Sequence, residues 1–330
     1  MSERYTVVIP THNGRRRLPA VLEGLERQQQ AGEFDVVVVD DGSTDGTADW
    51  LERRQGTVRP RVVRQRNSGP AAARNRGVAA AETATVAFLG DDTIPLPGWL
   101  SAHRRARERH AGNAPLVVVG YTRPHPRIFL TPFLRWINRQ GWQFGYDLID
   151  DPADLAFNFF YTSNASLPRR LLEEERFDEG FPFAAWEDTE LGYRLKKRGV
   201  RIVFAKDAET LHDHPSDLRR FCERQRRAGY CAVVFYQRHP ELHEFLGLGA
   251  GRLPPRPALW GHLKRLLRAR LLEGTAAEMP EVWNEVLHFY YVAGMEQAWR
   301  DLTARGTPPP VPQPALEGYP RPVIASRRAP

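Results

Sequence analysis

The first 120 residues alternate between strand-like and helix-like segments, and this alternation limits the fold more than any other feature of the sequence. Its clearest member is the run FDVVVVD at 34–40, which is almost continuously apolar and therefore typical of a strand covered on both faces. Strands are predicted at 5–10, 34–40, 61–65, 83–89 and 115–120, and helices at 18–30, 46–54, 69–81 and 97–110. The pattern predicts a Rossmann-like α/β fold, with a mostly parallel sheet flanked by helices and joined by right-handed crossovers.

The alternation is lost beyond residue 120. Aromatic residues and prolines crowd into 121–160, where a packed insertion is favoured slightly over a lid or an acceptor groove. The segment 157–168 is interpreted as a strand, 177–199 as a stretch that ends in a helix, and 200–205 as a further strand.

These changes divide the chain into three predicted parts. After residue 215 the sequence turns mostly helical, and it ends in a proline-rich stretch that is expected to be poorly ordered. The parts are an α/β domain at 1–215, with halves at about 1–120 and 121–215, a mainly helical C-terminal extension at 216–305, and a flexible tail at 306–330.

Composition places the chain among globular proteins, with 42% apolar and 26% charged residues. It contains no apolar run of about 18 residues, so no membrane-spanning helix is expected. The start MSERYTVVIP enters a strand at once and lacks a signal-peptide pattern, which predicts a cytoplasmic protein, with the inner face of the membrane as an alternative location.

The formal net charge is +7, and nearly all of the positive charge is arginine. Arginine suits phosphates and anionic surfaces, but it also follows from a GC-rich genome, and the two interpretations have equal weight. A nucleic-acid-binding protein would need a basic stripe with stacking aromatics or a known module. Residues 1–215 offer neither, so no nucleic-acid partner is expected.

Polar residues follow three of the predicted strands at the point where each strand ends. These are Pro10-Thr11-His12-Asn13, Asp40-Asp41-Gly42-Ser43 and Asp91-Asp92. Ligands of parallel sheets bind at this edge. Within each pair of adjacent aspartates, the two carboxylates repel each other unless water solvates them or a cation binds them. The stretch PTHNG after the first strand has one glycine, so a glycine-rich phosphate loop is absent. For an isolated Asp-Asp pair a polar turn is the better interpretation, and a cation at the carboxylates is the alternative.

Five motifs occur in an order that resembles the family-2 glycosyltransferases. They are VVIPTHNG, VVVVDDGSTDGT, NSGPAAARNRGVAAA, FLGDDTIPLPGWL and WEDTELGYRLKKRG, and together they cover about 5–215. The resemblance implies a GT-A fold, with the nucleotide-sugar half at 1–120 and the acceptor half at 121–215. It also implies the inverting transfer of a sugar from a nucleotide-diphospho-sugar, with a UDP-sugar favoured, to an acceptor hydroxyl. The implied setting is bacterial polysaccharide, glycolipid or glycoprotein glycan assembly, with a glycan, lipid-linked or protein-linked acceptor.

The resemblance also implies roles for individual residues. The residues expected to bind the nucleotide-sugar are Pro10, Thr11, Asn13, Asp40, Asp41, Gly69, Arg74 and Asp91. Among them Asp41 would meet the base, Arg74 would lie near the base and the phosphates, and Asp91 would reach the ribose or a metal-bound water.

A metal site and a catalytic base complete the implied set. Asp92 stands where the family has its usual metal ligand, although Gly90 replaces the first acid of the frequent FLDDD pattern. His212, with His214 two residues on, is expected to complete a site for Mn²⁺ or Mg²⁺.

Asp188 matches the family's catalytic base, with Glu187 as its neighbour and the alternative base. Without the other motifs, helix capping and favourable interaction with the helix dipole would be the better interpretation of this Glu-Asp pair.

Three further questions stay open. The basic amphipathic stretches 218–240 and 258–274 are interpreted as helices packed on the protein with arginines in solvent, or as membrane-surface helices, and the first is favoured. The aromatic-rich segment 281–302 predicts core or a homodimer contact. A sugar nucleotidyltransferase is the alternative enzyme, but PTHNGRRRL matches its expected glycine-rich signature poorly.

Overall fold

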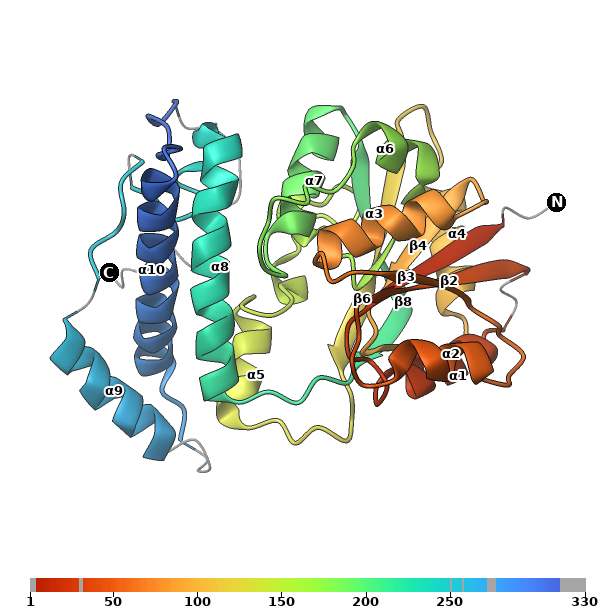
Figure 1. Ribbon diagram of the computed structural model, residues 1–330, viewed down its shortest axis with the longest axis horizontal. Coiled ribbons are helices and arrows are strands. Elements are labelled where there is room, and N and C mark those ends of the chain that lie inside the picture. Colours follow the sequence, from red (N-terminus) through yellow and green to blue (C-terminus); the bar gives the residue numbers. More distant parts are fainter. Residues whose placement is uncertain (1–3, 30–31, 250, 257, 272–276, 315–330) are drawn as a thin grey trace. The chain divides into compact units, whose positions relative to one another are not determined.

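The computed structural model describes residues 4–29, 32–249, 251–256, 258–271 and 277–314 (Figure 1). The chain divides into two compact units, each of which is considered by itself. Unit 1 comprises Met1–Ile128 and Ile149–His214, and unit 2 comprises Phe129–Leu148 and Pro215–Pro330.

Unit 1 is built on one eight-stranded sheet with the strand order β3-β2-β1-β4-β7-β6-β8-β5. Four strand pairings are parallel and three, which involve β7 and β5, are antiparallel. The strands are β1 (Tyr5–Thr11), β2 (Phe34–Asp41), β3 (Arg61–Gln65), β4 (Thr85–Leu89), β5 (Thr93–Pro95), β6 (Leu116–Pro124), β7 (Asn164–Pro168) and β8 (Arg201–His212).

Helices cover both faces of this sheet (Figure 1). They are α1 (Leu18–Glu26), α2 (Thr47–Arg53), α3 (Pro70–Ala80), α4 (Trp99–Arg109), α6 (Arg169–Glu174), α7 (Glu187–Lys197) and the short 3₁₀ helix η2 (Phe157–Phe159). Val36 and Val38 of β2 belong to the core cluster under α1 and α4, while the alternate residues Val37 and Val39 are also buried. Both faces of β2 are therefore covered, which explains its nearly continuous apolar sequence.

Unit 2 is helical. Its elements are α5 (Pro132–Arg139), η1 (Tyr146–Leu148), α8 (Leu218–Arg238), η3 (Pro240–Leu242), α9 (Leu259–Leu271) and α10 (Pro280–Ala304). Phe133 of α5 lies edge-to-face with Phe221 of α8 and with Trp283 of α10, at centroid distances of 5.8 and 5.7 Å. The aromatic residues of α5 therefore form core with the C-terminal helices.

The predicted α/β fold with a mostly parallel sheet and a mainly helical C-terminal part is confirmed, with local differences. Of the predicted strand 157–168 only β7 is extended, because η2 and a turn occupy 157–163. The predicted strand 200–205 is longer and runs as β8 to His212.

The domain boundaries stay a prediction. The change of unit at 214–215 lies beside the predicted boundary, but 129–148, assigned from the sequence to the acceptor half, groups with unit 2. Of the proline-rich tail, 315–330 lie outside the described residues, while Pro310 O accepts a hydrogen bond from Tyr236 of α8. No helix in the described part of the chain has the length and apolarity that a bilayer crossing requires.

A buried asparagine holds the centre of the sheet. The side chain of Asn164, on β7, accepts hydrogen bonds from Trp99 Nε1 (2.8 Å) and His103 Nε2 (3.0 Å) of α4. Its amide nitrogen donates to the carbonyls of Tyr121 (3.2 Å) and Ala208 (2.9 Å). One fully buried side chain thus joins β7, α4, β6 and β8. Burial lowers the pKa of His103 to about 4, so this imidazole stays neutral.

Replacement of Asn164 by alanine is predicted to destabilise the protein by roughly 3–5 kcal/mol, because it leaves several buried donors and acceptors without partners. Chemical denaturation of wild type and variant measures the difference. Asn113→Ala, the same change in an exposed loop, should cost less than about 0.5 kcal/mol. Equal losses in the two variants would contradict the role given to the buried network.

Candidate active site

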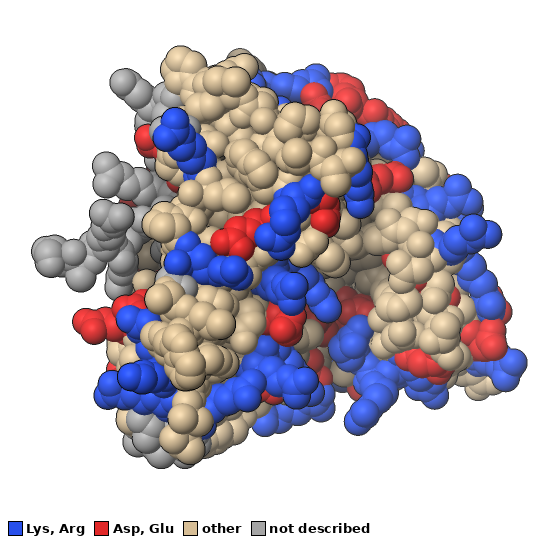
Figure 2. Space-filling view, turned by 60° about the vertical axis from the view of Figure 1, so that its left-hand side comes forward, with Lys and Arg blue, Asp and Glu red and all other residues tan. Residues whose placement is uncertain are grey.

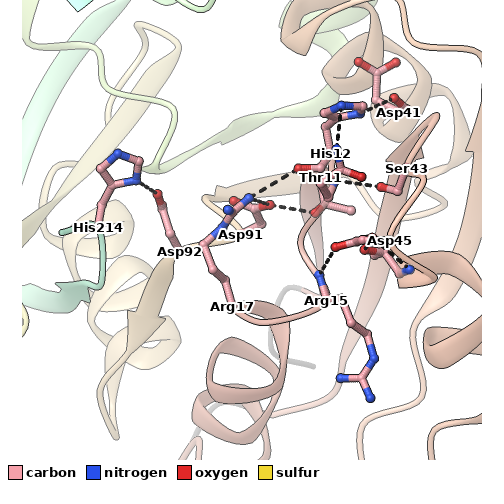
Figure 3. A network of polar contacts seen from close by, with 12 residues as sticks. Thr11, His12, Arg15, Arg17, Asp41, Ser43, Asp45, Asp91, Asp92 and His214 are labelled. Atoms are coloured by element: carbon pink, nitrogen blue, oxygen red, sulfur yellow. Dashed lines mark hydrogen bonds and ion pairs between the residues drawn. The ribbon is translucent and has the colours of Figure 1, made fainter. Parts of the chain in front are cut away.

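The ends of β1 and β4 are joined through Asp91. Its Oδ2 accepts a hydrogen bond from Thr11 Oγ1 at 2.6 Å (Figure 3). The same oxygen forms an ion pair with Nη2 of Arg17, the residue just before α1, at 2.7 Å. A Cβ atom at Gly14 would lie 2.0 Å from Thr11 Oγ1 and 2.9 Å from Asp91 Oδ2. A glycine is therefore required for this turn to approach the two side chains.

Asp92 faces two histidines at the end of β8. Its Oδ2 lies 3.0 Å from His214 Nδ1 (Figure 3) and 3.5 Å from His212 Nε2. The two imidazole rings are stacked nearly parallel, with an interplanar angle of 7°. The pairing of β5 with β8, which sets Thr93 opposite His212, brings the three groups together. One ligand atom of each lies within 4.8 Å of the others, so the predicted metal ligands do converge.

The two adjacent carboxylates have opposite electrostatic surroundings. Burial and the charge of Asp92 raise the pKa of Asp91, although Arg17 and Thr11 oppose this. Burial alone would raise the pKa of Asp92, but the hydrogen bonds and charges of His212 and His214 outweigh it and hold that pKa well below its ordinary value. Asp92 is therefore the more firmly ionised carboxylate of the pair.

Gly90 shapes the turn that carries this pair. The Thr93 amide donates to Gly90 O at 3.1 Å. A Cβ at position 90 would lie 2.6 Å from Thr93 Oγ1 and 3.1 Å from Asp92 Oδ1. A side chain here would displace Asp92 or Thr93, so the glycine that departs from the FLDDD pattern fits the present position of Asp92.

The ends of β1 and β2 are cross-linked by short polar contacts (Figure 3). His12 Nδ1 lies 2.9 Å from Asp41 O, and the Asn13 amide donates to Ser43 Oγ at 2.8 Å. Asn13 adopts a positive φ of 53°, a conformation that asparagine tolerates better than most residues. Pro10 precedes this turn opposite Val39.

Asp41 organises the approach to α3. Its Oδ1 accepts from Gln65 Nε2 and the Ser68 amide, both at 2.8 Å, and its Oδ2 accepts from the Gly69 amide at 2.9 Å. Gly69 is the N-cap of α3 with φ 90°, where a side chain would be strained. Asp40 accepts a bond from the Ser43 amide at 3.3 Å. The predicted nucleotide-binding residues of β1, β2 and β4 thus meet at one edge of the sheet.

Glu187 and Asp188 form a second acidic cluster at the start of α7. Arg74 of α3 donates to Glu187 Oε1 at 2.8 Å, and both side chains are largely buried. The guanidinium of Arg74 also lies 5.5 Å from the ring centroid of Phe177. The structure therefore places Arg74 beside the predicted base.

The environment of Asp188 favours its neutral form. Burial and the charge of Glu187 raise the pKa of Asp188 to about 6, against the opposing effects of Arg74 and of the Thr189 and Thr162 amides. Segment 162–163 also connects the Glu187–Asp188 pair to the turn that carries Asp92. Ser163 O accepts a hydrogen bond from the Gly90 amide at 3.1 Å. A carboxylate with a pKa near neutral is suited to accept a proton.

Comparison with known proteins decides the family. Residues 6–174 match glycosyl transferase family 2, and 142–272 match glycosyl transferase family group 2. The chain belongs to glycosyl transferase family 2. A similar curated relative is the validoxylamine A glucosyltransferase of Streptomyces hygroscopicus subsp. limoneus, 32% identical over 271 residues. That match covers 72% of this chain and 57% of the relative, so the chain spans about three fifths of the curated relative's length.

Solved structures of similar fold place this family-2 chain in the GT-A class. S. aureus TarS 1–349 in complex with UDP superposes with a TM-score of 0.53 at 17% identity, over 96% of this chain and 98% of that one. The mannosyltransferase PcManGT from Pyrobaculum calidifontis, in complex with GDP-Man and Mn²⁺, has a TM-score of 0.52 at 19% identity, over 94% and 77%. These likenesses confirm the GT-A-type fold.

Sequence reasoning on this family-2 chain missed Arg17. Arg17 stands just before α1, where the helix dipole disfavours a cation. The run RRR before the helix was the signal, because a charge placed against its local preference indicates a partner elsewhere. That partner, Asp91, is 74 positions away in sequence, and no local pattern identifies it.

The Arg74→Met variant is predicted to be about 3 kcal/mol less stable than wild type, because Glu187 is left buried without its cation. Adding Glu187→Gln should recover most of the loss, since it removes the unpaired charge. Arg61→Met, which breaks an exposed ion pair with Glu82, should cost less than about 1 kcal/mol. Urea unfolding of the wild type, of these three variants and of the single Glu187→Gln variant measures these values, and an additive double variant would contradict the pairing.

Proposed function

We propose that this glycosyltransferase moves a sugar from a nucleotide-diphospho-sugar, with a UDP-sugar favoured, to an acceptor hydroxyl with inversion. The observation that carries the proposal is the convergence of Asp92, His212 and His214 at the sheet edge that also holds Asp91 and Asp41. The UDP and GDP-Man complexes of proteins with a similar fold support a nucleotide-sugar donor. The acceptor belongs to a glycan, a lipid-linked or a protein-linked molecule.

The nucleotide would lie along the ends of β1, β2 and β4. The residues available to it are Pro10, Thr11, Asn13, Asp40, Asp41, Gly69, Arg74 and Asp91. Asp41 would accept a hydrogen bond from the base. Its carboxylate accepts hydrogen bonds in the same way from backbone amides at the start of α3. Thr11 and Arg17 fix the orientation of Asp91, which would meet the ribose.

The cluster at Asp92 fits a divalent cation. Two ligand atoms about 2.1 Å from one cation, at right angles to each other, lie about 3 Å apart, and Asp92 Oδ2 lies 3.0 and 3.5 Å from the two imidazole nitrogens. One carboxylate and two neutral imidazoles suit Mn²⁺, and Mg²⁺ less well. When bound, such a cation would neutralise charge on the diphosphate leaving group.

Asp188 is the proposed general base. The acceptor hydroxyl oxygen forms a bond to the anomeric carbon while the bond from that carbon to the diphosphate oxygen breaks, and its electron pair leaves with the nucleoside diphosphate. The hydroxyl proton passes to the Asp188 carboxylate. A single displacement of this kind inverts the anomeric configuration. Glu187 would act through Asp188 by keeping its pKa high.

Asp92→Asn is predicted to abolish Mn²⁺ binding by the nucleoside-diphosphate-loaded protein and to remove metal-dependent turnover, because the ionised ligand is lost. Titration calorimetry with Mn²⁺ and UDP measures the first effect, and release of UDP from a sugar-nucleotide panel measures the second. Asp207→Asn, at an exposed ion pair, is the matched control and should behave as wild type. Full wild-type turnover in EDTA would contradict the metal site.

Asp188→Asn is predicted to lower kcat by about 10²- to 10⁴-fold with little change in donor binding, because it keeps the shape of the side chain and removes its basicity. In the wild type, kcat/KM should fall as the pH drops below about 6, since the protonated carboxyl accepts no proton. The asparagine variant should lose this dependence. Near wild-type kcat in Asp188→Asn would place the base elsewhere, with Glu187 the first alternative.

Glu187→Gln should shift that acid limb to lower pH, because the negative charge of Glu187 is one cause of the raised pKa of Asp188. The same pH series of kcat/KM measures the shift. A limb that stays in place, or moves to higher pH, would contradict the coupling of the two acids.

A further inference from the structure

Helix α9 of unit 2 has a packed inner side. The imidazole of His262 stacks on Phe289 of α10 with a centroid distance of 3.6 Å. Ala269 is buried and Leu266 partly buried in the core cluster that α9 shares with α10. Arg265 forms an ion pair with Glu285 of α10. These contacts hold the inner side of α9 against α10.

The outer side of α9 is also apolar. Leu259, Leu263, Leu267 and Leu271 recur every four residues, so they lie on one side of the helix, and Trp260 lies next to them. These five side chains are between 45% and 79% exposed, and they are five of the eight exposed large apolar residues in the described part of the chain. A contiguous stripe of this kind indicates a binding surface rather than scattered exposed residues.

The same helix is strongly basic. None of its 13 residues is acidic, and the exposed side chains of Lys264, Arg268 and Arg270 have no ion pair with any described residue. In the space-filling view, blue Lys and Arg side chains border tan areas of the surface (Figure 2). The stripe is thus accompanied by cations without counter-charges on the helix.

We propose that this outer side of α9 docks on an anionic lipid surface, with Trp260 and the leucines in the acyl boundary and Lys264, Arg268 and Arg270 among the headgroups. Charge decides the occupant. A second copy of α9 would set three cations against three like charges, whereas anionic headgroups complement them. Tryptophan and leucine on one side with basic residues beside them are the composition of interfacial helices. The proposal does not depend on the sugar-transfer chemistry.

Sedimentation with vesicles tests this in the full chain. Wild type is expected to bind vesicles of equal parts phosphatidylglycerol and phosphatidylcholine, more weakly at high salt, and to bind pure phosphatidylcholine poorly. Lys264→Glu/Arg268→Glu should lower the partition constant by at least about 25-fold, because each basic side chain near an anionic surface contributes about a fivefold factor. Lys206→Glu/Arg109→Glu makes the same change in net charge at exposed positions of unit 1 and should leave binding within about threefold of wild type.

Insertion is tested separately from adsorption. Leu263→Ser/Leu267→Ser should lower binding at least about tenfold, with an unchanged thermal midpoint as the fold control. Vesicles with brominated acyl chains should quench part of the tryptophan fluorescence of wild type, and that quenched part should be absent in Trp260→Phe. The proposal is overturned if wild type binds neither vesicle, binds both equally, or binds independently of these variants. It is also overturned if wild type forms a dimer that Leu263→Ser/Leu267→Ser dissociates, because a second copy then covers the stripe.

Discussion

The adjacent carboxylates of Asp91 and Asp92 impose the main electrostatic constraint on unit 1. Two partly buried like charges at one strand end repel each other, and in this fold each has its own cationic or proton-donating partner. Arg17 and Thr11 face Asp91, while His212 and His214 face Asp92. These partners come from opposite ends of the domain sequence. The conformation of the chain before α1 and the extension of β8 to His212 both bring partners to the turn that carries Asp91 and Asp92.

In the second acidic pair, the surroundings of Asp188 shift its pKa in the direction opposite to that of Asp92. At Asp92 the surroundings lower the pKa, which keeps an anion ready for a cation, whereas at Asp188 burial and Glu187 raise the pKa to about 6, which suits a group that takes up a proton. The difference follows from what stands opposite each acid. Asp92 has two imidazoles, but the one cation near the Glu187–Asp188 pair in the described contacts, Arg74, bonds to Glu187. Two pairs of adjacent carboxylates therefore acquire different chemistry.

The sequence allowed the parallel half of the sheet and its polar edge to be predicted, because periodicity and strand-end residues are local properties. It did not reveal that β7 enters antiparallel between β4 and β6, since its partner strands are distant in sequence, as are the partners of Asn164, which lie between 43 and 65 positions away. The grouping of α5 with the C-terminal helices depends on distant contacts as well, because Phe133 packs against Phe221 and Trp283, which lie 88 and 150 positions further along the chain. Residue identities at the site were suggested by motif resemblance, whereas Arg17 and the Arg74–Glu187 pair required the structure.

Helix α3 joins Asp41 at the end of β2 to the Glu187–Asp188 pair. Asp41 holds its first residues through the Gly69 amide, and Arg74, five positions further on, reaches Glu187. Each residue of an α-helix turns the chain by about 100°. One residue inserted between Gly69 and Arg74 would leave the strand-end contacts in place and rotate the guanidinium away from the acid it neutralises. The length of this stretch, and not only its composition, therefore determines whether Asp41 and the Glu187–Asp188 pair can both be contacted from α3.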